Sequence, residues 1–178
     1  MTSREDVVKW VRSFVGLSAV HDPNGELARL VDFPGGAPPE QEVLIKTNCA
    51  MFACGILRQL GCKHPLLHHE YVNGMALTWV LEIGRETGSL YLPHAGPGPQ
   101  VGDILHWATA PKPGVKPRND DHVAFIVAGP FERRMIQRAG GGAANNEITE
   151  STDLADYSLD HWRPLRHYVN IEQVLNGH

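Results

Sequence analysis

The chain has 178 residues and a formal net charge of −4, with 42% of its residues hydrophobic and 20% charged. That length and balance suit a single globular domain, residues 1–178, with a core of its own. They argue against nucleic acid as a partner and against membrane insertion, because no Lys/Arg run exceeds two residues and no apolar run approaches the roughly 18 residues that span a bilayer.

The N-terminal residues indicate where the protein is located in or outside the cell. Residues 1–6 carry acids and lack the basic and apolar regions of a secretory signal. We therefore expect a protein that is cytoplasmic when made, or one that a specialised secretion system exports to a periplasmic target without a cleavable signal.

A first helix is predicted over residues 7–15, where apolar residues recur at helical spacing. Ser3 ahead of Asp6 is placed to cap it in a capping-box arrangement. Residues 21–46 contain four prolines and several glycines, which predicts a long irregular surface segment.

Two further helices are predicted before residue 90. One is expected to begin at Thr47 or Asn48, either of which can cap it, and to run to Leu60 before Gly61. The other covers residues 72–83 and has the strongest helical period in the chain.

Short segments rich in β-formers follow Gly88, separated by turn residues. The expected strands are residues 101–107, 122–128, 134–138 and 165–170. Helices first and strands afterwards predict an α+β fold, with N-terminal helices packed on a C-terminal antiparallel sheet.

Three residues in this arrangement carry chemistry. Cys49 falls in the first turn of the predicted second helix, where the helix dipole and unpaired N–H groups favour a thiolate and lower its pKa from about 8.5 toward neutrality. His122 opens a predicted strand, from which its imidazole can accept the thiol proton. Gln137, in the next strand, can orient that imidazole through its other nitrogen. Cys54 and Cys62 are better explained as packing thiols, and the odd count without metal-ligand spacing predicts no metal site.

Three motifs resemble the NlpC-type cell-wall peptidases and their CHAP relatives. Thr47-Asn48-Cys49-Ala50-Met51-Phe52 is similar to the nucleophile helix of that superfamily. Residues 99–107, Pro-Gln-Val-Gly-Asp-Ile-Leu-His-Trp, resemble its Gly-Asp strand, and residues 122–127 resemble its histidine strand. The order of these elements is that of the superfamily, and the similarity covers about residues 47–140.

The resemblance implies a papain-like α+β fold and hydrolysis of amide bonds, most often in peptidoglycan peptides, with no cofactor. Gln137 matches the position of the orienting residue, and we expect Asn48, Trp107 and Asp121 to contact substrate. The whole chain looks most like the compact amidases that bacteria inject into rivals, so a peptidoglycan peptide is the expected substrate and a cognate immunity protein a possible partner.

Several alternatives stay open from the sequence. Cys49 can be a buried structural thiol, and Asn145, Asn146 or Glu147 can replace Gln137 as the orienting residue. The same scaffold also suits a deamidase, a transglutaminase-like enzyme or a lipid acyltransferase, and a catalytically inactive copy would serve as a binding module. Asp121 can be a turn residue. His64, His68 and His69 are interpreted as solvated loop histidines, because their spacing is not that of a zinc site.

Overall fold

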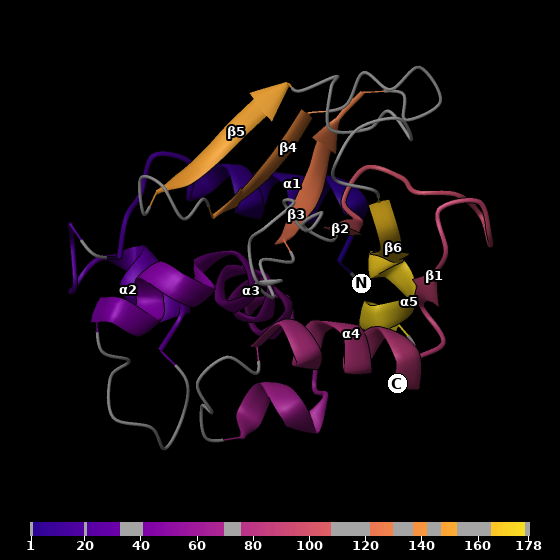
Figure 1. Ribbon diagram of the computed structural model, residues 1–178, viewed down its shortest axis with the longest axis horizontal. Coiled ribbons are helices and arrows are strands. Elements are labelled where there is room, and N and C mark those ends of the chain that lie inside the picture. Colours follow the sequence, from indigo (N-terminus) through magenta and orange to yellow (C-terminus); the bar gives the residue numbers. More distant parts are fainter. Residues whose placement is uncertain are drawn as a thin grey trace, which may run out of the picture.

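A computed structural model describes residues 2–19, 21–32, 41–69, 76–107, 122–129, 137–141, 147–152 and 165–176. These residues form an α+β structure of helices and one antiparallel sheet (Figure 1). The helices are α1 (Arg4–Ser13), α2 (Glu26–Leu30), α3 (Gln41–Gln59), the 3-10 helix η1 (Pro65–His68), α4 (Ala76–Glu86) and α5 (Ile171–Asn176). The strands are β1 (Leu90–Tyr91), β2 (Ile104–Trp107), β3 (His122–Ala128), β4 (Gln137–Gly141), β5 (Ile148–Thr152) and β6 (Leu165–Val169).

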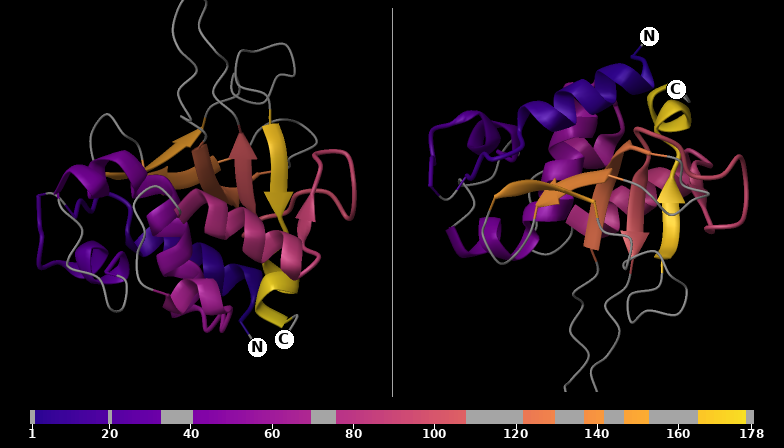
Figure 2. Two further views of the ribbon diagram at one scale, coloured as in Figure 1. Left: turned by 60° about the horizontal axis from the view of Figure 1, so that its bottom comes forward. Right: turned by 90° about the horizontal axis from the view of Figure 1, so that it is seen from above.

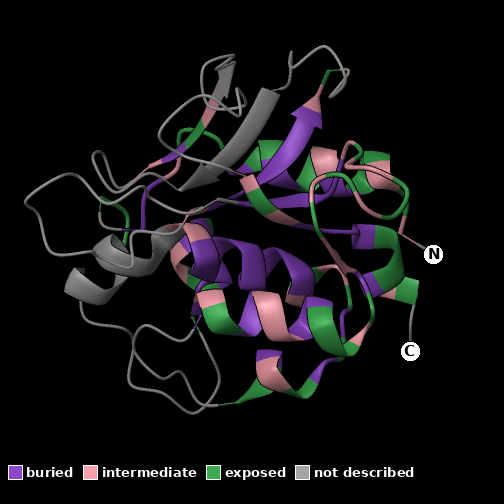
Figure 3. Cartoon of the chain, turned by 45° about the vertical axis from the view of Figure 1, so that its right-hand side comes forward, coloured by how far each residue is buried: buried purple, intermediate pink, exposed green. Residues whose placement is uncertain are grey.

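The sheet has the strand order β1-β6-β2-β3-β4-β5, and every neighbouring pair is antiparallel. Its strands alternate between two apolar layers. Val123, Phe125 and Val127 of β3 join the large core formed with the helices, whereas Ala124 and Ile126 join a smaller cluster on the other face. Buried residues accordingly dominate β3 and residues 49–59 of α3 (Figure 3), and α3 packs against both β3 and β4.

The predicted cap of the first helix is confirmed. The Ser3 hydroxyl accepts a hydrogen bond from the Asp6 N–H, and the Asp6 carboxylate accepts one from the Ser3 N–H, which together form a capping box. Val7 and Val11 are fully buried on the inner side of α1. The start of α1 lies beside α5 in both views of Figure 2.

The second predicted helix differs from α3 at its start. α3 begins at Gln41 rather than at Thr47 or Asn48, so Cys49 is its ninth residue and lies in the helix interior. Residues 41–46 include glutamine, glutamate, leucine and lysine, which are good helix formers. The prolines at positions 38 and 39, which disfavour a helix, come before this segment. Helix propensity over these residues therefore outweighs the capping signal at Thr47 and Asn48.

Asp103 holds the start of β2 in place. Gly102 precedes it with φ of 94°, a left-handed conformation that favours glycine. The Asp103 carboxylate is fully buried and accepts hydrogen bonds from the Gln100 N–H at 2.8 Å, the Ile171 N–H at 3.0 Å and the Arg4 guanidinium at 2.6 Å. The Gly-Asp motif thus joins α1, β2 and α5, and it orders the strand that pairs with His122.

Most of the predicted strands are present, with shifted ends. β3 covers residues 122–128 as expected, and β2 and β6 lie within their predicted ranges. β4 begins at Gln137, three residues after the predicted start at residue 134, and ends at Gly141, three residues after the predicted end at residue 138. The sequence did not predict β1 or β5.

Candidate active site

Cys49 differs from the other two thiols in its accessibility. Cys54 and Cys62 are buried, whereas Cys49 is partly exposed at the edge of the main core. The Cys54 thiol donates a hydrogen bond to the Ala76 carbonyl at 3.5 Å, which fixes it between α3 and α4. Cys49 is therefore the most exposed of the three cysteine residues, and its sulfur itself lies in buried surroundings.

The sulfur of Cys49 accepts a hydrogen bond from the main-chain N–H of Val123. The N–H of Ile126 donates to the Asp103 carbonyl just ahead of β2. Because N–H directions alternate along a strand, the Val123 N–H points to the opposite edge of β3, toward β4. The β3–β4 ladder runs from Ala128 and Gln137 to Phe125 and Ala139. The sulfur therefore lies next to the start of β3, against the main core.

His122 is the residue immediately before Val123. It is partly exposed, and it pairs with Trp107 across β2. Alternation places its side chain on the face of Ala124 and Ile126, opposite to the face that α3 covers. However, the His122 Cα is two covalent bonds from the Val123 nitrogen, so it lies within roughly 6 Å of the sulfur. The backbone of His122 is therefore adjacent to the sulfur, whereas its side chain leaves the strand on the other face of the sheet.

Burial raises the pKa of the Cys49 thiol. The N–H groups of Val123, Ala50 and Cys49 itself act in the opposite direction, but they do not outweigh burial. The expected lowering toward neutrality is therefore wrong, first because the thiol is buried and second because the longer α3 places it in the interior of the helix. A thiol in the interior of a helix does not meet the unpaired N–H groups of a helix start. At neutral pH the resting group is a thiol rather than a thiolate.

The position of Gln137 does not fit the predicted orienting role. Gln137 pairs with Ala128, which lies at the opposite end of β3 from His122. Six residues of extended chain separate Ala128 from His122, a distance of roughly 20 Å. No amide side chain spans that distance. β5 begins at Ile148, at the end of the sheet where β3 begins, so Glu147 directly before it is a better candidate for the orienting group.

The other predicted site residues are only partly placed. Asn48 precedes Cys49 in α3, and the backbone of Trp107 lies opposite His122, so both belong to the same region. Asp121, Asn145 and Asn146 lie outside the described residues. Glu147 directly precedes β5, and its carboxylate is 3.9 Å from His21.

The structure also answers the question raised by the three neighbouring histidines. His64 is buried, caps η1 and lies 2.8 Å from the Glu86 carboxylate, so it has a structural role, whereas His68 and His69 are exposed. Within the described part of the chain, no three His, Cys, Asp or Glu side chains converge on one point.

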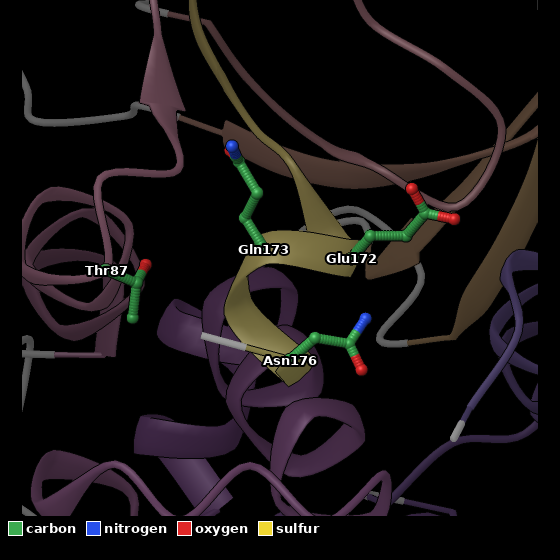
Figure 4. A pocket seen from close by; sticks show the side chains of 4 residues that line it. All are labelled: Thr87, Glu172, Gln173 and Asn176. Carbon is green, nitrogen blue, oxygen red and sulfur yellow. The ribbon is translucent and has the colours of Figure 1, made fainter. Parts of the chain in front are cut away.

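Two features of the molecule were not anticipated. An open depression of about 450 Å³ is lined by Thr87, Glu172, Gln173 and Asn176, where α4 ends and α5 runs (Figure 4). It lies near the β1–β6 edge of the sheet rather than near Cys49. His106 of β2 and His167 of β6 form a close pair. The only sequence signal for it was a histidine within each of two predicted strands.

Comparisons with known proteins give no assignment. The chain matches no family model, and neither curated proteins nor solved structures give a match. Among the helices that the structure describes, none combines the length and the apolar character needed to cross a membrane.

Proposed function

We propose that the protein is a cysteine hydrolase of papain-like architecture that cleaves a peptide amide bond, with Cys49 as nucleophile and His122 as base. The observation that carries the proposal is the hydrogen bond from the Val123 N–H to the Cys49 sulfur. It joins residues 74 positions apart that belong to two of the motifs, and it places a partly exposed cysteine residue beside a histidine.

The raised pKa of Cys49 defines how the thiol would act. Because the resting group is protonated, the proton must leave as the sulfur attacks the carbonyl carbon. His122 accepts that proton, and the new S–C bond gives a tetrahedral intermediate. The imidazolium then protonates the leaving amine, the C–N bond breaks, and a thioester remains on Cys49. Water, deprotonated by His122, attacks the thioester and releases the acid and the thiol.

The substrate class rests on the resemblance to cell-wall peptidases. We propose a peptide amide of peptidoglycan, with Asn48 and Trp107 near the bond that is cut, and a cognate immunity protein as the natural inhibitor. Glu147, which directly precedes β5 at the end of the sheet where β3 begins, is the proposed source of the group that orients the imidazole. Gln137 is no longer proposed for this role.

A second candidate function is a catalytically inactive binding module, and the burial of the Cys49 sulfur favours it. The two proposals differ in one experiment. Purified sacculi are incubated with wild-type protein and with Cys49→Ala, and the soluble fragments are identified by mass spectrometry. The hydrolase proposal predicts fragments with a new amine and a new carboxylate from the wild type alone. Binding of both proteins to sacculi without fragments would support the module instead.

A further inference from the structure

His106 and His167 face each other across the seam between β2 and β6. They are directly opposite in the strand register, and their Nδ1 atoms are 3.2 Å apart. His106 is 4% exposed, and His167 is half-buried. The pair lies on the same face of the sheet as Val123, which is the residue opposite His106 on β3.

The distances fix how the two rings are arranged. The ring centroids are 5.5 Å apart, and the ring planes differ by 3°. The distance between the centroids is longer than the distance between the Nδ1 atoms by about twice the distance from a ring's centre to its atoms. A larger difference is impossible, and this one arises only when each Nδ1 points directly at the other ring. Both nitrogens therefore lie on the line between the centroids, and the rings lie edge to edge in one plane rather than face to face. An Nδ1–H of one ring points straight at the lone pair of the other.

This geometry accepts one proton between the two nitrogens. One Nδ1 must carry a hydrogen and donate, and the other must be bare and accept. A second proton would place two N–H groups head to head at 3.2 Å, so the bond must break before both rings are charged on these nitrogens. The pair is therefore stable as a neutral or singly charged unit.

The surroundings oppose a second positive charge. Burial lowers the pKa of His167, and His106, Arg85 and Arg166 lower it further. Arg85 comes from α4 and is ion-paired with Glu82 of the same helix, Arg166 belongs to β6, and β3 contributes the apolar Val123. No carboxylate acts on the pKa of His167 from the described elements.

We propose that His106 and His167 form a one-proton latch that holds β6 on β2 at neutral pH and opens under acidic conditions. β6 pairs with β1 and β2 and leads into α5, so loss of the hydrogen bond between the two histidines loosens the C-terminal part of the sheet. β2 also pairs with His122, so the release would reach the end of the sheet where Cys49 lies. The latch does not depend on the proposed hydrolase activity.

The test compares the pH dependence of unfolding in three proteins. Below about pH 6.5 both histidines bind a proton in the unfolded chain, whereas the folded pair binds only one. This difference of one proton raises the wild-type unfolding constant by up to tenfold for each unit by which the pH falls. His167→Asn leaves an amide side chain beside His106. It also removes the second proton, which the unfolded wild-type chain binds and the folded pair does not. His94→Asn removes an exposed histidine and serves as the matched control. Urea unfolding from pH 7.5 to pH 5 should show a shallower pH dependence in His167→Asn, and a wild-type dependence in His94→Asn.

Nitrogen NMR of the wild-type imidazoles tests the latch without any substitution. At pH 7.5 one ring of the pair should carry its proton on Nδ1, with the other Nδ1 bare, and only one proton should bind to the pair as the pH falls to the onset of unfolding. Two bare Nδ1 atoms, two independent titrations in the folded protein, or equal pH dependence in all three proteins would overturn the proposal.

Discussion

The sulfur of Cys49 accepts a hydrogen bond from the N–H of Val123, so a helix side chain meets an N–H at the edge of a strand. The bond fixes the middle of α3 to the start of β3, one residue from His122. It also gives the Val123 N–H a hydrogen-bond acceptor, which a backbone N–H in a buried strand requires.

The three thiols should differ in their rates of alkylation. Cys49 is partly exposed, whereas Cys54 and Cys62 are buried, so a limiting amount of iodoacetamide should modify Cys49 first. Because the pKa of Cys49 is raised, its rate should keep rising with pH beyond about 8.5 instead of reaching a plateau near neutrality. Peptide mapping by mass spectrometry measures both. Labelling of Cys54 before Cys49 would show that this thiol is not the accessible one.

His122 and Gln137 should respond differently to removal of the side chain. His122→Ala should lower the turnover of the proposed substrate by roughly 10²–10⁴-fold, because the thiol then loses its base. Gln137→Ala should stay within about twofold of wild type, because Gln137 is opposite Ala128 and remote from His122. Steady-state rates of fragment release from sacculi measure both. A large loss in Gln137→Ala would mean that the register of β4 is different.

Asp103 should be far more sensitive to substitution than a surface acid. Asp103→Asn removes the buried carboxylate that binds the Arg4 guanidinium, whose side chain is 15% exposed, and leaves it, among the described residues, only the exposed Glu172 carboxylate at 3.4 Å. The substitution should lower the free energy of unfolding by roughly 3 kcal/mol. Glu150→Gln is the matched control. Its ion pair with Arg12 at 2.8 Å is largely solvated, so the loss should stay below about 1 kcal/mol. Urea unfolding at pH 7 measures both losses of stability. Equal losses would contradict the stabilising role of the buried hydrogen bonds to Asp103.

Cys54 should make the protein less stable in alkali. Burial raises the pKa of this thiol far above its ordinary value. Above about pH 8.5 the unfolded chain releases a proton that the folded protein keeps, so the free energy of unfolding falls by up to about 1.4 kcal/mol per pH unit for this thiol. Cys54→Ala should show a shallower fall between pH 8.5 and pH 9.5, whatever its stability at pH 7. An unchanged slope would mean that Cys54 ionises in the folded protein.

The fold class followed from local patterns, because those patterns are set by short-range physics. The capping box of Ser3 and Asp6 and the strand of residues 122–128 depend on a few neighbouring residues, and both are present as predicted. The start of α3 could not be placed in the same way. A capping signal at Thr47 competes there with good helix formers between Gln41 and Lys46, and the balance between them depends on the whole segment.

The site was harder to predict than the fold, because it depends on register and burial. The motif order placed Cys49 near His122, and the structure brings Cys49 to the neighbouring residue Val123. Gln137 was assigned by its position in the chain, yet β4 runs antiparallel to β3, so its first residue pairs with Ala128 at the end of β3 and lies far from His122. The pairing of His106 with His167 joins two strands 61 residues apart, which no local pattern records.

A covalent intermediate on Cys49 tests the central claim most directly. Wild-type protein and Cys49→Ala are mixed with solubilised peptidoglycan peptides, quenched in acid within the first turnovers and digested for mass spectrometry. The proposed mechanism predicts an acyl adduct on the peptide that contains Cys49, removed by hydroxylamine as expected of a thioester, with no adduct and no turnover in Cys49→Ala. Turnover by Cys49→Ala at the wild-type rate would contradict it.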